Sequence, residues 1–306
     1  MTRFLGVDFG ATYAKLVILE GEGNRRDVVA SARVPTGSRD QPEIVTSRIA
    51  ESSSELLAAN GGAAAIGVGI PGLFDKVGRI ELFPNLPDTW HGHPFGEQMS
   101  TALGAPVFFI NDARAFTLAE CRMGAAASAS TVLCLTLGTG VGGGVVVDGR
   151  LRFGPLGRAG EIGHQVIEAG GPLCGCGNHG CLEAFATSAA LCRLGGQETP
   201  EGVFAAAVQG DQKAAHAVAT LVSKLAQGIG NLVTVLWPDL IVIGGGVATA
   251  GEQLLAPLRA AVAAAAPVVD PSSYRIVPAV LGSSAGAIGA ALWAHEHALG
   301  RDPVSA

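Results

Sequence analysis

The chain has 306 residues, of which 44 are glycine, 48% are hydrophobic and only 15% are charged. This apolar, charge-poor composition excludes intrinsic disorder, and the clustering of the glycines excludes collagen. The net charge is −6 and the sequence has no long run of Lys or Arg, so the charge pattern does not indicate a nucleic-acid-binding surface.

Two features of the N-terminal half bear on the compartment. The acidic residue Asp8 lies where a secretory signal peptide would have its uninterrupted apolar region, so the sequence does not predict such a signal. The uncharged stretch over residues 123–147 is long enough to cross a bilayer, but its six glycines and its Ser and Thr residues predict buried strands and a loop. We therefore expect a soluble, cytoplasmic protein without a membrane segment.

Two segments share one pattern, in which an apolar strand, a Gly/Thr turn and a second apolar strand follow one another. The first covers residues 4–19 with its turn at 10–12, and the second covers residues 132–147 with its turn at 138–140. Each segment predicts a β-hairpin. Their recurrence predicts a duplicated architecture of two lobes, each with its own sheet.

Helices and strands alternate along the rest of the chain. The sequence predicts helices over residues 43–60, 113–123, 213–237 and 285–299, and strands over residues 63–70, 106–110 and 239–243. The last of these strands enters the glycine turn 244–246. This alternation predicts an α/β fold.

The two hairpin turns carry residue types that suit phosphate groups. Asp8 ends the first strand beside Gly10 and Thr12, where a carboxylate can hold a hydrated Mg²⁺ near phosphate oxygens, although ordinary turns use the same residues. Glycines in the second turn let backbone N–H groups approach a phosphate. A strand follows that turn where a dinucleotide-binding motif needs a helix, so the glycine turns predict a different kind of nucleotide site.

Asn111 and Asp112 lie where a strand meets a helix, a frequent place for active-site groups in α/β folds. Both residue types also cap helices, and a capping carboxylate has part of its acceptor capacity occupied. The functional interpretation of Asp112 is a general base that takes a proton from a substrate hydroxyl.

Three of the six cysteines fall within eight residues, at Cys174, Cys176 and Cys181. With one histidine they form a Cys₃His set, which is typical of a closed, structural Zn²⁺ site. His164 and His179 are both candidates for the fourth ligand, and the spacing alone leaves that choice open. The cytosolic compartment favours metal ligands or thiols over disulfides.

Two glutamates bracket the cysteine segment. If a metal pins it, Glu161 and Glu183 are held on a rigid loop where they can accept hydrogen bonds from polyol hydroxyls, although both also read as solvated side chains. Asn85, by itself, reads as a turn residue.

Taken together, these segments resemble the ROK family of sugar kinases within the actin-like ATPase fold. The resemblance rests most specifically on Glu161-Ile162-Gly163-His164 and the cysteine segment, and it extends over Asp8 to Thr12, residues 67–72 and 84–86, Asn111-Asp112 and the later glycine turns. It implies a two-lobed, ribonuclease H-like α/β fold with a zinc knuckle in the larger lobe. The small lobe would cover residues 1–116, with a C-terminal helix of about 288–306 packing back on it, and the large lobe would cover residues 117–287.

The resemblance also implies a role for each motif. Asp112 would be the base facing the 6-hydroxyl of a hexose, ATP would be the donor, and lobe closure would align the two and exclude water. The residues implied for the sugar are Asn85, Asn111, Asp112, Glu161, His164 and Glu183. Those implied for ATP and Mg²⁺ are Asp8, Gly10, Thr12, Gly138, Thr139, Gly140 and Gly245. The implied zinc ligands are His164, Cys174, Cys176 and Cys181.

The resemblance leaves the substrate and the assembly open. Glucose is the first choice, with N-acetylmannosamine, N-acetylglucosamine, kanosamine or fructose as alternatives, and polyphosphate is an alternative donor. Family members commonly form homodimers or homotetramers. Some relatives are sugar-sensing repressors with a helix-turn-helix ahead of the first hairpin, for which the residues before Asp8 leave no room. One departure is Ala11, where the family usually has a second glycine; a methyl group there should be tolerable.

Overall fold

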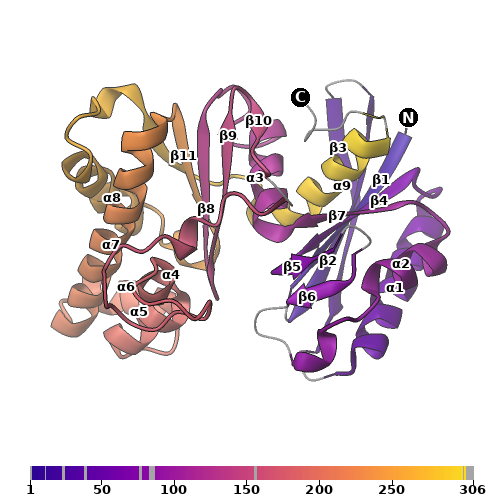
Figure 1. The fold of residues 1–306 in the computed structure, drawn as a ribbon, viewed down its shortest axis with the longest axis horizontal. Coiled ribbons are helices and arrows are strands. Elements are labelled where there is room, and N and C mark those ends of the chain that lie inside the picture. The colour runs from indigo at the N-terminus through magenta and orange to yellow at the C-terminus, as the bar shows by residue number, and fades with distance from the viewer. Residues whose placement is uncertain are drawn as a thin grey trace. The chain divides into compact units, whose positions relative to one another are not determined.

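The computed structural model describes residues 2–10, 12–22, 25–37, 40–75, 78–82, 87–154, 157–298 and 300. Ala11 and Asn85 lie outside the described residues. The chain forms two compact units, one made of Met1–Met123 with Ser283–Ala306 and the other of Gly124–Gly282 (Figure 1). The expected lobe boundary at residue 116 falls inside a helix that belongs whole to the first unit.

The first unit is built on a five-stranded sheet in the order β3-β2-β1-β4-β7. The hairpin predicted near the N-terminus is confirmed, since β1 and β2 pair antiparallel, while β4 and β7 run parallel to β1. Its strands are β1 (Thr2–Phe9), β2 (Tyr13–Glu22), β3 (Arg25–Pro35), β4 (Ala65–Ile70) and β7 (Val107–Asn111), with a small sheet of β5 (Leu73–Phe74) and β6 (Ile80–Leu82). Its helices are α1 (Pro42–Ala59), η1 (Asp88–Trp90), α2 (Phe95–Leu103), α3 (Asp112–Arg122) and α9 (Ala285–Ala298).

The second unit has a five-stranded sheet in the order β10-β9-β8-β11-β12. Its strands are β8 (Val132–Leu137), β9 (Val141–Val147), β10 (Arg150–Leu151), β11 (Leu240–Gly244) and β12 (Arg275–Pro278). Its α-helices are α4 (Glu183–Ala186), α5 (Ser188–Gly195), α6 (Pro200–Val208), α7 (Gln212–Leu236) and α8 (Glu252–Ala265). Short 3₁₀ segments are η3 (Ile162–His164), η4 (Gly246–Ala250) and η5 (Pro271–Ser273), and η6 (Gly282–Ser284) leads back to the first unit.

The two sheets repeat one topology. In each, an antiparallel hairpin is joined to a third antiparallel strand on one side and to two parallel strands on the other. The duplicated architecture predicted from the recurring hairpins is therefore confirmed, and so is the α/β class. Because β1 and β8 occupy the same place in their sheets, the turns at residues 10–12 and 138–140 leave equivalent strand ends.

Helix α9 closes the first unit by unusually close packing on β1, β4 and α3 (Figure 1). A Cβ added to Gly6 or Gly67 would overlap the backbone carbonyls of Ala287 or Ala290, and one added to Gly289 would overlap that of Ala115. Glycine at these positions lets a helix lie with its backbone almost on the sheet.

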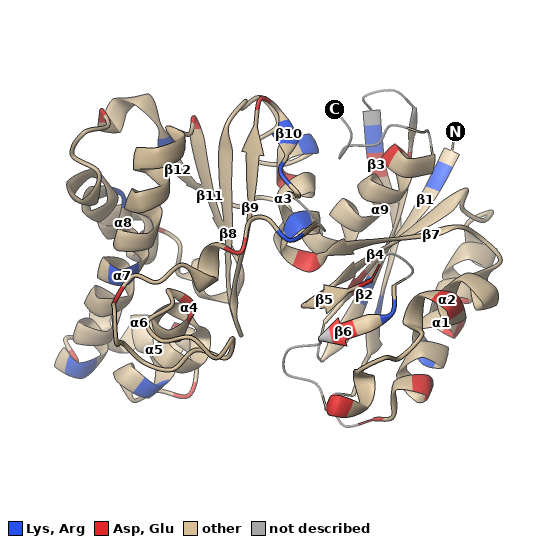
Figure 2. Cartoon of the chain, in the orientation of Figure 1, with Lys and Arg blue, Asp and Glu red and all other residues tan. Residues whose placement is uncertain are grey.

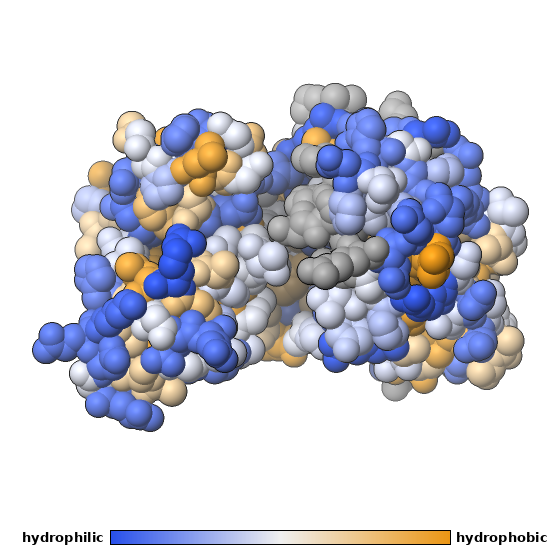
Figure 3. All heavy atoms as spheres, turned by 90° about the horizontal axis from the view of Figure 1, so that it is seen from below, coloured by the Kyte–Doolittle hydropathy of each residue, from blue (hydrophilic) through white to orange (hydrophobic). Residues whose placement is uncertain are grey.

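Helix α7 is long and apolar enough to cross a membrane by length and composition alone. In the structure, its apolar side chains, among them Leu221, Leu225 and Ile229, are buried in the core of the second unit. The uncharged stretch over residues 123–147 holds β8 and β9, as predicted. In the view of Figure 2, Lys and Arg lie scattered among acidic residues on both units, and the face in Figure 3 shows apolar side chains in small groups among hydrophilic ones.

Candidate active site and metal cluster

Asp8 lies near the carboxyl end of β1, directly opposite Lys15 of β2. Its Oδ2 is 3.5 Å from Lys15 Nζ. Burial raises the pKa of Asp8, while the nearby Lys15 charge acts in the opposite direction. A Cβ at Gly286, in the first turn of α9, would come within 2.7 Å of the Asp8 carboxyl carbon, so the helix N-terminus lies against this side chain.

The turn after β1 is tied to the end of β3. Thr36 is buried; its hydroxyl donates to Gly10 O at 2.9 Å, and its backbone N–H donates to Thr12 O at 3.0 Å. Gly10 N donates to Tyr13 O at 3.2 Å, which closes the turn. Thr12 is exposed. Gly10 and Thr12 are thus each held by backbone hydrogen bonds, and Thr12 presents a hydroxyl-bearing side chain to solvent.

The capping question raised by Asn111 and Asp112 has a clear answer. Asn111 is the N-cap of α3, and its Oδ1 accepts from Ala113 N at 3.1 Å and Arg114 N at 3.3 Å. Asp112 is the first residue of the helix, and its Oδ1 accepts from Ala113 N at 2.8 Å. Asn111 therefore provides the N-cap, and one carboxylate oxygen of Asp112 shares the N–H of Ala113 with it.

Asp8 and Asp112 belong to the same edge of the first sheet. β1, β4 and β7 are parallel, Asp8 is in register with Gly69, and Gly69 is in register with Ile110. A Cβ at Gly69 would lie 3.7 Å from the Cα of Asp112 and 3.6 Å from the carbonyl oxygen of Val7. Carboxyl ends of parallel strands are a common location for active-site groups.

In the second unit, the turn at residues 138–140 is held at both ends by the segment that follows the cysteines. Ser188 N donates to Gly138 O at 2.8 Å, and Val141 N donates to Glu183 Oε2 at 2.9 Å. Thr139, at the tip, is exposed. A Cβ at Gly140 would come within 2.7 Å of Glu183 Oε2, so glycine leaves room for that carboxylate.

The glycine turn after β11 lies beside the turn after β8. Gly244 is in register with Thr136, and Gly245 has a φ of +87°. A Cβ at Gly245 would overlap the backbone of Leu137. The two glycine turns are thus neighbours at the carboxyl edge of parallel strands, as a site for phosphate groups requires.

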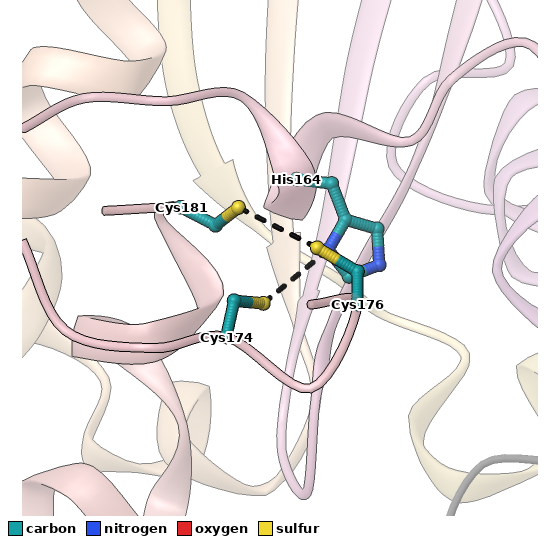
Figure 4. A group of neighbouring side chains, drawn as sticks. All are labelled: His164, Cys174, Cys176 and Cys181. Carbon is teal, nitrogen blue, oxygen red and sulfur yellow. Dashed lines mark hydrogen bonds between the residues drawn. The ribbon is translucent and has the colours of Figure 1, made fainter. Parts of the chain in front are cut away.

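Four potential metal ligands converge in the second unit (Figure 4). The ligand atoms of His164, Cys174, Cys176 and Cys181 all lie within 4.8 Å of one another. Cys174 Sγ is 3.6 Å from His164 Nδ1, and Cys176 Sγ is 3.7 Å from Cys181 Sγ. Tetrahedral Zn²⁺ with these ligands has S···S edges of about 3.8 Å and S···N edges of about 3.6 Å, which these two separations match, while the other pairs lie within 4.8 Å.

His179, the alternative fourth ligand, is engaged elsewhere. It forms an isolated bridge with Leu173, and its Nδ1 lies 3.1 Å from Gly171 O. The structure therefore favours His164 over His179, which the sequence spacing could not do. Burial raises the pKa of Cys174 to about 12, whereas the N–H of Asn178 lowers the pKa of Cys176.

Glu183 lies between the cluster and the glycine turn. Its Oε1 is 3.6 Å from Cys174 Sγ and 4.0 Å from His164 Nδ1, while its Oε2 accepts from Val141 N. The interpretation of Glu183 as a solvated side chain is wrong, because this carboxylate is mostly covered and hydrogen-bonded. Glu161 is exposed and directly precedes η3, which carries His164.

The sequence analysis did not predict three residues that contact site residues: Lys15 lies beside Asp8, Arg114 donates to Asn111, and Ser188 donates to Gly138. Lys15 could have been found from the hairpin register, and Arg114 from its helical spacing of three residues after Asn111. Ser188 acts through its backbone, so its side chain gives no signal. The fold thus groups Asp8, Asn111 and Asp112 in the first unit, and the glycine turns, Glu183 and the cysteine cluster in the second.

Comparison with known proteins assigns the chain to a family. Residues 4–297 match the family described as the ROK family. A glucokinase from Thermotoga maritima is 36% identical, with 94% of this chain and 96% of that protein covered. Relatives near 30% identity include an N-acetyl-D-glucosamine kinase from Pasteurella multocida and a putative xylose repressor from a Caldicellulosiruptor species, of which the match covers 68%.

Solved structures agree with this assignment. A ROK hexokinase from Thermus thermophilus superposes with a TM-score of 0.86 at 34% identity, covering 98% of this chain and all of that one. A ROK-family glucokinase from Streptomyces griseus, in complex with glucose and AMPPNP, superposes with a TM-score of 0.81 at 29% identity, covering 96% of this chain and 99% of that one. With two mixed sheets of one topology, the fold is of the actin-like ATPase type, and the chain belongs to the ROK family.

Proposed function

We propose that this protein is a sugar kinase that transfers the γ-phosphoryl group of ATP to the 6-hydroxyl of glucose. The observation that carries the proposal is the position of Asp112 at the start of α3, directly after the N-cap Asn111 and at the carboxyl edge of the parallel strands that end near Asp8. The similarity to glucokinases over nearly the whole chain supports glucose and ATP as the substrates.

In this proposal Asp112 is the general base. Its carboxylate accepts the proton of the 6-hydroxyl as the hydroxyl oxygen attacks the γ-phosphorus and the bond to ADP breaks. Phosphoryl transfer asks for alignment and charge neutralisation more than for covalent chemistry. Asn85, Asn111, Glu161, His164 and Glu183 are proposed to bind the sugar hydroxyls.

The phosphate tail of ATP is assigned to the hairpin turns. Gly10, Thr12, Gly138, Thr139 and Gly140 are proposed to face the phosphates, and Gly245 the nucleoside. Asp8 is proposed to hold Mg²⁺ through water, and its burial at a strand end beside a helix N-terminus fits an acceptor for a hydrated cation. When bound, Mg²⁺ would neutralise charge on the phosphate oxygens.

The cysteine cluster is proposed to hold a structural Zn²⁺ through His164 Nδ1, Cys174, Cys176 and Cys181. The Cys₃His donor set, and the two ligand separations that match the edges of a tetrahedral site, support this ion. The site supplies rigidity rather than chemistry, because four protein ligands complete the coordination. A cytoplasmic homodimer or homotetramer is proposed from the family resemblance.

One assay tests both the proposed kinase activity and the proposed role of Asp112 as the general base. ADP release should be measured for the wild type and for Asp112→Asn across a panel of glucose, mannose, fructose, N-acetylglucosamine, N-acetylmannosamine and kanosamine, with ATP or polyphosphate as donor. Glucose with ATP should give the highest kcat/KM. Asp112→Asn should lower kcat at least ~100-fold while the Kd for glucose stays within a few-fold.

Each result of that assay has a separate meaning. ADP release with none of the sugars would refute the kinase function, and unchanged kcat in Asp112→Asn would remove Asp112 from its role. A preference for N-acetylglucosamine would replace glucose with that sugar as the proposed substrate, an alternative that the similarity to the Pasteurella multocida kinase supports.

A further inference from the structure

Arg114 places a buried cation next to the residue that caps α3. Its side chain is 2% exposed, and it lies in the first turn of the helix. Arg114 Nη1 donates to Asn111 Oδ1 at 2.7 Å. This bond is shorter than the two backbone bonds to the same oxygen, and a charged donor makes it the strongest of the three.

Three donors on one oxygen determine which way the Asn111 carboxamide faces. The group has an acceptor oxygen on one side and a donor NH₂ on the other. Turning it over would place the NH₂ against two backbone N–H groups and a guanidinium, and the helix cap would be lost. The NH₂ of Asn111 is therefore directed away from the start of α3.

We propose that Arg114 is a positioning residue for sugar binding, which acts by holding Asn111 so that residue 111 offers only hydrogen-bond donors to the substrate. This inference rests on the proposed function and adds a requirement for the substrate. The sugar oxygen that meets Asn111 must accept a hydrogen bond, whereas the one that meets the Asp112 carboxylate must donate. Consecutive residues thus impose opposite requirements, which helps to fix the orientation of the sugar ring.

A double-mutant cycle tests whether Arg114 acts through Asn111. Arg114→Met removes the guanidinium and keeps a long apolar stem, and it should raise KM for glucose about tenfold, as loss of one oriented hydrogen bond does. The KM for ATP and kcat should stay within ~3-fold. In an Asn111→Ala background, Arg114→Met should have no further effect on KM for glucose, because the group it holds is absent.

Asn111→Asp tests the donor requirement without disturbing Arg114. An aspartate keeps an oxygen for the three donors but replaces the NH₂ with a second acceptor. A carboxylate at a helix N-terminus is favourable, so Tm should be unchanged or higher, while KM for glucose should rise as much as in Asn111→Ala. Should Arg114→Met fail to fold, Arg114→Lys, which keeps the charge with a different geometry, should give an intermediate KM.

Two results would overturn the proposal: wild-type KM for glucose in Asn111→Asp, or independent, additive effects of Arg114→Met and Asn111→Ala. Both presuppose an active wild type. A wild type that phosphorylates no hexose would instead refute the proposed function, so the two failures are distinguishable.

Discussion

His93 is buried between α1 and the start of α2, where its two ring nitrogens have different surroundings. Its Nε2 lies 2.9 Å from Thr46 Oγ1, and the Thr46 hydroxyl donates its hydrogen to Pro42 O. The hydroxyl must therefore accept from His93, so the neutral ring carries its hydrogen on Nε2. Burial lowers the pKa of His93, although Glu43, 3.7 Å from Nδ1, opposes that shift.

This lowered pKa predicts a stability change with pH. The unfolded chain binds a proton at this residue below about pH 6.5, whereas the folded chain resists it, so the stabilisation is complete above that pH and decreases as the pH falls toward the folded-state pKa. Thermal unfolding should show a smaller loss of Tm from about pH 7.5 to about pH 5.5 in His93→Gln than in the wild type.

Exposed His91, two residues earlier, provides the matched control. His91→Gln should lose as much Tm over the same pH change as the wild type does. Equal losses in all three proteins would show that His93 does not contribute to the pH dependence.

The sequence was a good guide to residues whose chemistry is local. The position of Asn111 before a helix and the clustering of the three cysteines can be recognised from a few neighbouring residues. The cysteines do converge in the structure. The choice of His164 over His179, and the bond from Val141 N to Glu183, depend on how distant segments pack. Those facts are properties of tertiary structure, which no local pattern contains.

Among the elements, the contact of α9 with the first sheet depends most on glycine. Gly6 and Gly67 lie on neighbouring strands in register with each other, beneath backbone carbonyls of α9. Any side chain on the strands at these points would lift the helix off the sheet. Phe4, which strand alternation places on the same face of β1 as Gly6 and which packs against His295 of α9, would then lose part of its cover.

Gly67→Ala is expected to destabilise the first unit by about 1–3 kcal/mol, the usual cost of forcing extra volume into a packed core. Gly69→Ala, two residues along the same strand, is the matched control, because an added Cβ there meets only ordinary contacts of 3.6–3.7 Å. Denaturant unfolding should show a lower midpoint for Gly67→Ala. A midpoint equal to that of Gly69→Ala would contradict the close packing.

Element prediction succeeded where apolar periodicity is strong and missed elements with weaker patterns. Both hairpins and the helices α1, α3, α7 and α9 lie within a few residues of their predicted positions. Helix α8 was missed, since Pro257 lies inside it and proline normally ends a helical pattern. Strand β3 was missed because Arg26, Asp27 and Arg33 interrupt its apolar residues on an exposed face.

At the scale of the whole molecule, the four residues of the Cys/His cluster all belong to the second unit. The metal should therefore stabilise one unit directly. Cys181 forms an isolated bridge with Val166, outside the main sheet, and the Sγ atoms of Cys176 and Cys181 lie 3.7 Å apart, so a bound ion would add to the rigidity of this segment.

Purified protein should contain about one zinc ion per chain. Removal of the metal by a chelator should increase amide hydrogen exchange over residues 162–188 and at the N–H of Val141, which donates to Glu183, and leave exchange in β1 and β4 unchanged. Cys176→Ser should reproduce the effect, whereas Cys192→Ser, which changes a cysteine outside the cluster, should not. Zinc-free protein with unaltered exchange over 162–188 would contradict a structural role.

The first unit is built from two segments of the chain that lie on either side of the second unit in the sequence, and this order matters during synthesis. The second unit is a single continuous stretch, whereas the first is completed only by α9, which follows the whole second unit in the sequence. On the ribosome, the surface of β1 and β4 that α9 covers stays open until α9 has been made, by which time the second unit already has all of its strands. Although β1 and β4 are made long before α9, their α9-facing surface is therefore among the last to be covered, and until then it is open to unspecific contacts.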